Sequence, residues 1–201
     1  MTKAEGILRR ARTMLILGIG DEPFFGSIAL GLELIADPKF KSAATNGIDL
    51  RYNPDWIETL DPEEAMGLFE HEVFHVGLKH ARLMRDVIKE PDFNNDIWQW
   101  SCDQPINERL LEKGRKLPGT PIYDPKYDGM SAIRVYRLRM EELANTPPVC
   151  TMGQPDPSGQ PGQSDSPSEP DSSSQPDSED QPDPSQTPKD LTSDPNMCGR
   201  Y

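Results

Sequence analysis

All three histidines of this 201-residue chain lie within ten residues, between His71 and His80. The first two stand in the pattern H-E-x-x-H, with Glu72 directly after the first. Residues four positions apart share one face of an α-helix, so His71 and His75 on adjacent turns can bind one metal ion. The pattern therefore predicts a helix here, with its histidine face turned toward further ligands.

The residues before the motif predict where this helix begins. Asp61-Pro62-Glu63-Glu64 offers an N-cap, a proline at the first helical position and acidic residues in the first turn. The helix is therefore predicted from Pro62, extending to Ile88. Its apolar side chains are those of a buried helix: Ala65, Met66, Leu68, Phe69, Val73, Phe74 and Val76. The plainer alternative is a half-buried histidine pair on an amphipathic helix, with Glu72 a solvated neighbour.

A catalytic Zn²⁺ site usually has three protein ligands and a water, so a third ligand must come from elsewhere. The first candidate is Asp103, because a carboxylate on the next helix can complete the histidine pair. His80 is the alternative third ligand. It lies about 180° from His71 and about 140° from His75 around the helix axis, so it reaches the metal only if the helix breaks at Gly77.

The segment around Asp103 contains further polar candidates. Asn107 lies one turn later and can hydrogen-bond a metal ligand, and Glu108 is another nearby acid. Pro105 removes a helical hydrogen bond unless this helix begins near Cys102, in which case Asp103 is an N-cap.

The chain has a formal charge of −13, and its last part contributes much of it. From Thr151 onward the chain contains ten acidic and two basic residues, in a stretch rich in Pro, Ser, Asp, Gln and Gly. Such a stretch buries too little surface to offset the entropy of ordering, so 147–201 is predicted to be a disordered tail. It is either a docking site for a protein partner or a passive terminus. The acidic balance argues against nucleic-acid binding.

Residues 1–146 are enough for one domain with a core. Helices are predicted at 3–17, 96–113 and 130–144, a strand at 48–53, and a helix or buried strand at 27–36. This order indicates an α+β fold, mostly helical with a small sheet.

The three cysteines, Cys102, Cys150 and Cys198, form no disulfide framework and no C-x-x-C pair. Cys102 is predicted to be a buried thiol. The apolar run near the N-terminus follows helical spacing and is too short to span a membrane. The expected location is therefore the cytoplasm.

Several stretches together resemble the zincin-like metallopeptidase domain family of bacteria and phages. They are Phe24-Phe25-Gly26, Leu50-Arg51-Tyr52-Asn53-Pro54, His71-Glu72-x-x-His75 with His80 and Arg82, Cys102-Asp103-x-x-Ile106-Asn107, Leu117-Pro118, Tyr127-Asp128-Gly129-Met130-Ser131-Ala132 and Val135-Tyr136. The resemblance covers about residues 5–140. Family members often carry a C-terminal von Willebrand factor A-like domain, where this chain has the acidic tail. The resemblance implies that His80 and Asp103 both lie where the family has such residues, and it leaves open which of them binds the metal. The alternative role for His80, or for Arg82, is to stabilise an oxyanion or to orient a carboxylate.

The function predicted from these residues is zinc-dependent hydrolysis of a protein or peptide substrate. His71, His75 and Asp103 hold the metal, and Glu72 acts as general base on a metal-bound water. The strand at 48–53 precedes the metal helix and is expected to offer its edge to an extended substrate. The rival prediction is a non-catalytic zinc-binding or protein-interaction module, including an adaptor that acts through the tail.

Overall fold

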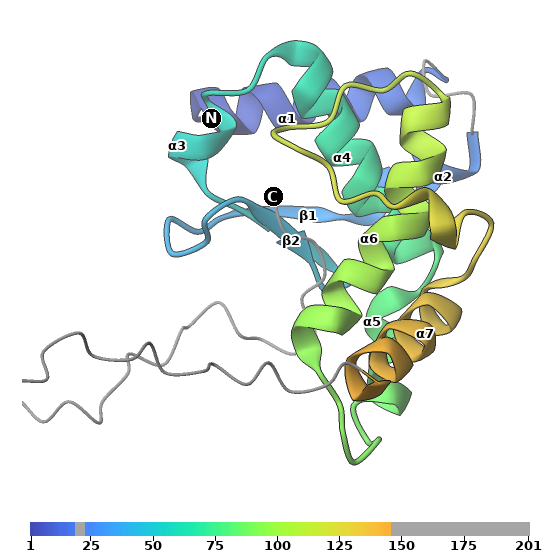
Figure 1. Cartoon of the computed structure of the whole chain (residues 1–201). Helices are drawn as coiled ribbons and strands as arrows, with labels where there is room; N and C mark the ends of the chain where they lie inside the picture. The colour runs from blue at the N-terminus through green and yellow to red at the C-terminus, as the bar shows by residue number, and fades with distance from the viewer. Residues whose placement is uncertain (19–22, 146–201) are drawn as a thin grey trace, which may run out of the picture. The chain divides into compact units, whose positions relative to one another are not determined.

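The computed structural model of the chain describes residues 1–18 and 23–145. These residues form helices around a three-stranded sheet, which confirms the predicted α+β class (Figure 1). The predicted disordered tail at 147–201 lies outside the described residues. In chain order the elements are α1 (Lys3–Ile16), α2 (Pro23–Gly31), β1 (Glu33–Ala36), β2 (Ala43–Thr45), β3 (Asp49–Tyr52), α3 (Pro54–Ile57), α4 (Pro62–Gly77), α5 (His80–Val87), α6 (Asn95–Glu112), the 3₁₀ turn η1 (Pro125–Tyr127) and α7 (Ala132–Asn145).

Helix α4 is the central element, with contacts to α1, α2, α6, α5 and β2 (Figure 1). Its start is as predicted, because Asp61 caps the helix and Glu64 returns a hydrogen bond to the Asp61 amide. All eleven residues from 65 to 75 are buried. Gly67 lets the Lys116 carbonyl approach so closely that a Cβ at this position would overlap it. The polar groups of the H-E-x-x-H motif are therefore held inside the fold on a capped, tightly packed helix.

The predicted helix to Ile88 is wrong in its extent, because the chain turns just after Gly77. Lys79 has φ 60°, a left-handed conformation that no other described non-glycine residue adopts, and α5 begins at the next residue. A Cβ at Gly77 would press into the ring of Phe25, so α4 ends where α2 packs against it. The stretch 27–36 likewise contains two elements, the end of α2 and the strand β1.

The sheet has the order β1-β3-β2, with β1 parallel and β2 antiparallel to the central strand β3. Strand β3 matches the predicted strand, and its Leu50 and Tyr52 side chains are buried in the core. The expectation that this strand offers a free edge to a substrate is wrong, since both its sides are paired. Among the described residues, β1 and β2 are the edge strands of this sheet.

Helix α6 begins at Asn95, well before Pro105, which lies inside it. The alternative of a helix starting near Cys102 with Asp103 as its N-cap is therefore wrong. Two buried clusters stabilise the fold: one joins α1, α2, the sheet, α4 and α6, and the other joins α5, α6 and α7. Cys102 is buried in the second cluster, as predicted.

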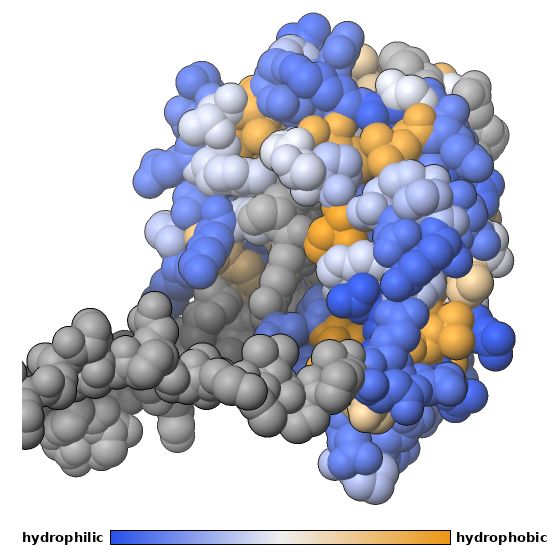
Figure 2. Space-filling model, in the orientation of Figure 1, coloured by the Kyte–Doolittle hydropathy of each residue, from blue (hydrophilic) through white to orange (hydrophobic). Residues whose placement is uncertain are grey.

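The face drawn in Figure 2 is largely hydrophilic, with hydrophobic atoms in separate patches among the coloured residues. Within the described ranges, 1–18 and 23–145, no helix has the length and apolarity that crossing a membrane requires.

Candidate metal centre

The centre starts from two imidazoles on one face of α4. His71 and His75 are both buried, with Nε2 atoms 2.9 Å apart. The i, i+4 spacing on a regular helix produces this approach, as the sequence pattern predicted. The two Nε2 atoms, which are potential metal ligands, therefore point toward the same place.

Helix α6 brings a carboxylate to the same point. Asp103 Oδ1 lies 3.2 Å from His75 Nε2 and 3.6 Å from His71 Nε2. Asp103 is buried, and its Oδ1 atom has no hydrogen-bond partner. One ligand atom from each of His71, His75 and Asp103 lies within 4.8 Å of the others, so this group could hold a metal ion. Imidazole and carboxylate are suitable ligands for divalent first-row metals.

The other nitrogen of His71 is held by Asn107, one turn after Asp103. Asn107 Oδ1 lies 2.9 Å from His71 Nδ1, and the Asn107 amide nitrogen donates to the Ile122 carbonyl at 2.9 Å. Since the amide nitrogen is used by Ile122, its oxygen faces the ring, and His71 Nδ1 must donate. The lone pair of His71 is therefore on Nε2, which faces His75 and Asp103.

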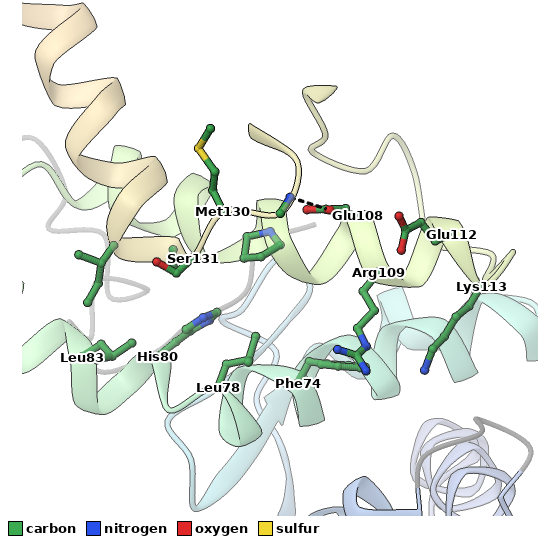
Figure 3. A pocket seen from close by; sticks show the side chains of 14 residues that line it. Phe74, Leu78, His80, Leu83, Glu108, Arg109, Glu112, Lys113, Met130 and Ser131 are labelled. Carbon is green, nitrogen blue, oxygen red and sulfur yellow. Dashed lines mark hydrogen bonds between the residues drawn. The ribbon is translucent and has the colours of Figure 1, made fainter. Parts of the chain in front are cut away.

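His80 lies on the other side of the His75 ring. Because the chain turns at Lys79, His80 begins α5 with its Nδ1 atom 3.0 Å from His75 Nδ1. When His75 Nδ1 carries the proton of this contact and donates it to His80 Nδ1, the lone pair of His75 is on Nε2, like that of His71. Figure 3 shows His80 lining a pocket between the α4–α5 turn and α6, with Phe74 and Leu78 nearby. His80, the alternative third ligand, thus contacts the predicted ligand His75, and it does not belong to the group formed by His71, His75 and Asp103.

Glu72 is buried beside these ligands, and neither of its carboxylate oxygens has a hydrogen-bond partner. Burial, followed by the nearby charge of Asp103, raises the pKa of the Glu72 carboxyl well above its ordinary value. A buried, unpaired carboxyl next to a possible metal group is suited to take up and release a proton.

The pKa values of His75, His80 and Asp103 are all lowered, in the direction opposite to that of Glu72. Burial lowers the pKa of His75, and burial followed by the charge of His75 lowers that of His80 well below its ordinary range, so both rings are neutral near pH 7. Burial alone would raise the pKa of Asp103, but its interactions with His71 and His75, when a proton lies on the ring nitrogens that face it, outweigh this and lower it to about 2. Neutral imidazoles and an ionised carboxylate are the forms in which these side chains bind metals.

Two other predicted residues lie apart from the converging atoms. Arg82 is exposed on α5 and lines a depression that also reaches His75. Glu108, the other nearby acid, accepts a hydrogen bond from the Gly129 amide at 2.9 Å and lines the pocket of Figure 3. The contact between His80 and His75 was not predicted from the sequence. The only signal for it was Gly77, a residue between the two histidines at which a helix can end.

A family model described as "Putative metallopeptidase domain" matches residues 7–196. An uncharacterized protein of Thermotoga maritima is 29% identical over 116 residues, which cover 55% of this chain and 27% of that protein. The chain therefore aligns with about a quarter of this relative's length. No solved structure matches the chain.

The family match covers most of the chain and includes every residue of the centre. On this ground the chain belongs to the putative metallopeptidase domain family.

Proposed function

We propose that the protein is a zinc-dependent peptidase, in which His71, His75 and Asp103 hold the metal and Glu72 is the general base. The observation that carries this proposal is the meeting of acceptor atoms: two imidazole nitrogens and Asp103 Oδ1, 2.9 to 3.6 Å apart in a buried site. Atoms of this kind repel one another unless a proton or a cation lies between them. Two histidines and a carboxylate are a ligand set found in zinc peptidases.

The outer contacts support the same assignment. Asn107 accepts from Nδ1 of His71, and Nδ1 of His80 is 3.0 Å from Nδ1 of His75. Ligating histidines almost always use their second nitrogen in this way, which fixes the ring orientation and raises the basicity of the ligand. We therefore assign Asn107 and His80 as residues that orient the two ligands.

Zinc bound here would lower the pKa of a coordinated water toward about 7 and polarise a peptide carbonyl. Glu72 takes the proton of the attacking water and then delivers it to the leaving amine. Its raised pKa brings its affinity for a proton closer to that required near neutral pH. His71, His75 and Asp103 keep their places during the reaction, because α4 and α6 pack directly against each other.

The test is a comparison of Glu72→Gln with wild type and with Glu63→Gln, an exposed control on the same helix. Zinc content is measured first, and turnover is then measured on a mixture of peptides. Glu72→Gln is expected to keep its zinc and to lose activity by a factor of about 10²–10⁴, the usual contribution of a general base. Glu63→Gln should retain both. Full activity in zinc-loaded Glu72→Gln protein would refute the assignment of the base.

A further inference from the structure

A second depression lies next to the metal centre, on the side of His75. Its volume is about 240 Å³, and its walls come from the β2–β3 turn and from α5. Three cationic side chains line it: Lys79, Arg82 and Arg85. No acidic residue is among its lining residues.

The three cations have no partners among the described residues. Each is exposed, and none is in an ion pair or a side-chain hydrogen bond with another described residue. Elsewhere the described cations commonly have acidic neighbours: Lys89 pairs with Asp86 one turn away, and Arg51 pairs with Asp49. An unpaired cluster in a chain of net charge −13 is therefore a distinct local feature.

The backbone places the three cationic residues beside the same depression. Lys79 has the single left-handed conformation among described non-glycine residues, which starts α5 immediately after the metal helix. Arg82 and Arg85 follow one turn apart on α5, so they share a face with each other. On the opposite wall the exposed side chain of Ile48 provides an apolar surface, and Thr45 ends the edge strand β2.

We propose that this depression is a specificity subsite for an acidic side chain of the peptide substrate, close to the bond that is cut. The inference rests on the proposed peptidase function, because His75 lines the depression and is one of the assigned metal ligands. A carboxylate can form charge-assisted hydrogen bonds with the two guanidinium groups and the ammonium group. The methylenes that lead to the carboxylate would contact Ile48.

Two measurements on the full chain test the subsite. The first is cleavage of a peptide library by the zinc-loaded enzyme, with identification of the residues that flank each cut. Asp and Glu are expected to be enriched at one position near the cut. Cleavage without such enrichment would refute the subsite while leaving the peptidase function intact, and failure to cleave any peptide would count against the peptidase function.

The second measurement is binding, which does not require activity. A fluorescent peptide with two Glu residues is compared with its Gln counterpart, both acetylated and amidated, on full-length Glu72→Gln protein. The Glu peptide is expected to bind about ten-fold more tightly, from several exposed charge contacts acting together. Arg82→Gln with Arg85→Gln should remove most of this difference, and the exposed control Arg10→Gln should leave it unchanged.

Three results would overturn the proposal. One is equal binding of the Glu and Gln peptides by the Glu72→Gln protein. Another is a preference seen only with a free peptide C-terminus, which would mean that the site recognises a terminal carboxylate. The third is a preference that emerges only when the ten acidic residues after Thr151 are changed to amides, which would identify the chain's own tail as the occupant.

Discussion

Replacing Asn107 by alanine should weaken metal binding without removing a ligand. The change deletes the acceptor 2.9 Å from His71 Nδ1 and the donor 2.9 Å from the Ile122 carbonyl. Loss of a group that orients a ligand typically lowers metal affinity about 10- to 100-fold, which corresponds to about 1.4–2.7 kcal/mol. The stoichiometry should stay unchanged, because His71, His75 and Asp103 are all present.

Gln104→Ala is the matched control. Gln104 lies on the same helix and is buried like Asn107, and it also makes two hydrogen bonds to the loop after α6, both to the Asp124 backbone. Each variant should lose about 1–3 kcal/mol of folding stability from its broken hydrogen bonds. Only Asn107→Ala should lose metal affinity, because Gln104 makes no hydrogen bond to a histidine.

The assay uses metal-free protein prepared with a chelator, titrated with zinc in competition with a chromogenic chelator. Urea unfolding of the metal-free variants measures stability separately. The reasoning is refuted if Asn107→Ala binds zinc within two-fold of wild type. It is refuted equally if Gln104→Ala weakens binding as much as Asn107→Ala does.

Three further predictions concern the packing and the charge around the centre. Gly67→Ala should destabilise the protein by about 1–3 kcal/mol in urea unfolding, since the new methyl overlaps the Lys116 carbonyl. Gly6→Ala on α1, where a Cβ would meet only the Met1 side chain at an ordinary 3.9 Å, should be neutral or stabilising. A Gly67→Ala protein as stable as wild type would contradict the packing. The hydrogen bond from Lys116 and those from the α4 amides lower the pKa of the Asp61 carboxyl, so its charge stabilises the fold above about pH 4 and that stabilisation is lost as pH falls through the lowered value. Asp61→Asn should therefore be less stable than wild type at pH 7 and converge with it in acid, and a constant difference across this range would count against the argument. His80→Phe should lower zinc affinity about ten-fold or more with one zinc still bound, whereas complete loss of the metal would show that His80 is a ligand.

Local signals in the sequence predicted much of this centre. The H-E-x-x-H spacing placed His71 and His75 on one helical face, and Asp61-Pro62 marked the start of that helix. Asp103 was chosen because a carboxylate on a second helix can meet such a pair, and the structure brings its Oδ1 atom to the same point. The first two features depend on short-range periodicity and capping, which can be read from the sequence, whereas the choice of Asp103 depended on the chemistry of metal ligands.

The features that were missed depend on contacts between distant segments. Lys79 carries no residue-type signal for a left-handed turn, so the break before His80 could not be read from propensity. The pairing of β3 on both sides depends on a parallel crossover from β1, which strand pattern alone does not reveal. The close approach at Gly67 likewise depends on a loop almost fifty residues away.

The central claim is that His71, His75 and Asp103 form a zinc site, and metal content tests it most directly. Full-length wild type, His71→Ala, Asp103→Ala and Glu108→Ala are purified identically, supplemented with zinc, desalted and analysed by mass spectrometry. Glu108 is the control, as an acid on the same helix whose carboxylate accepts from the Gly129 amide. The account predicts about one zinc per chain in wild type and Glu108→Ala, and loss of the metal in the other two. A full zinc complement in Asp103→Ala, or none in wild type, would contradict it.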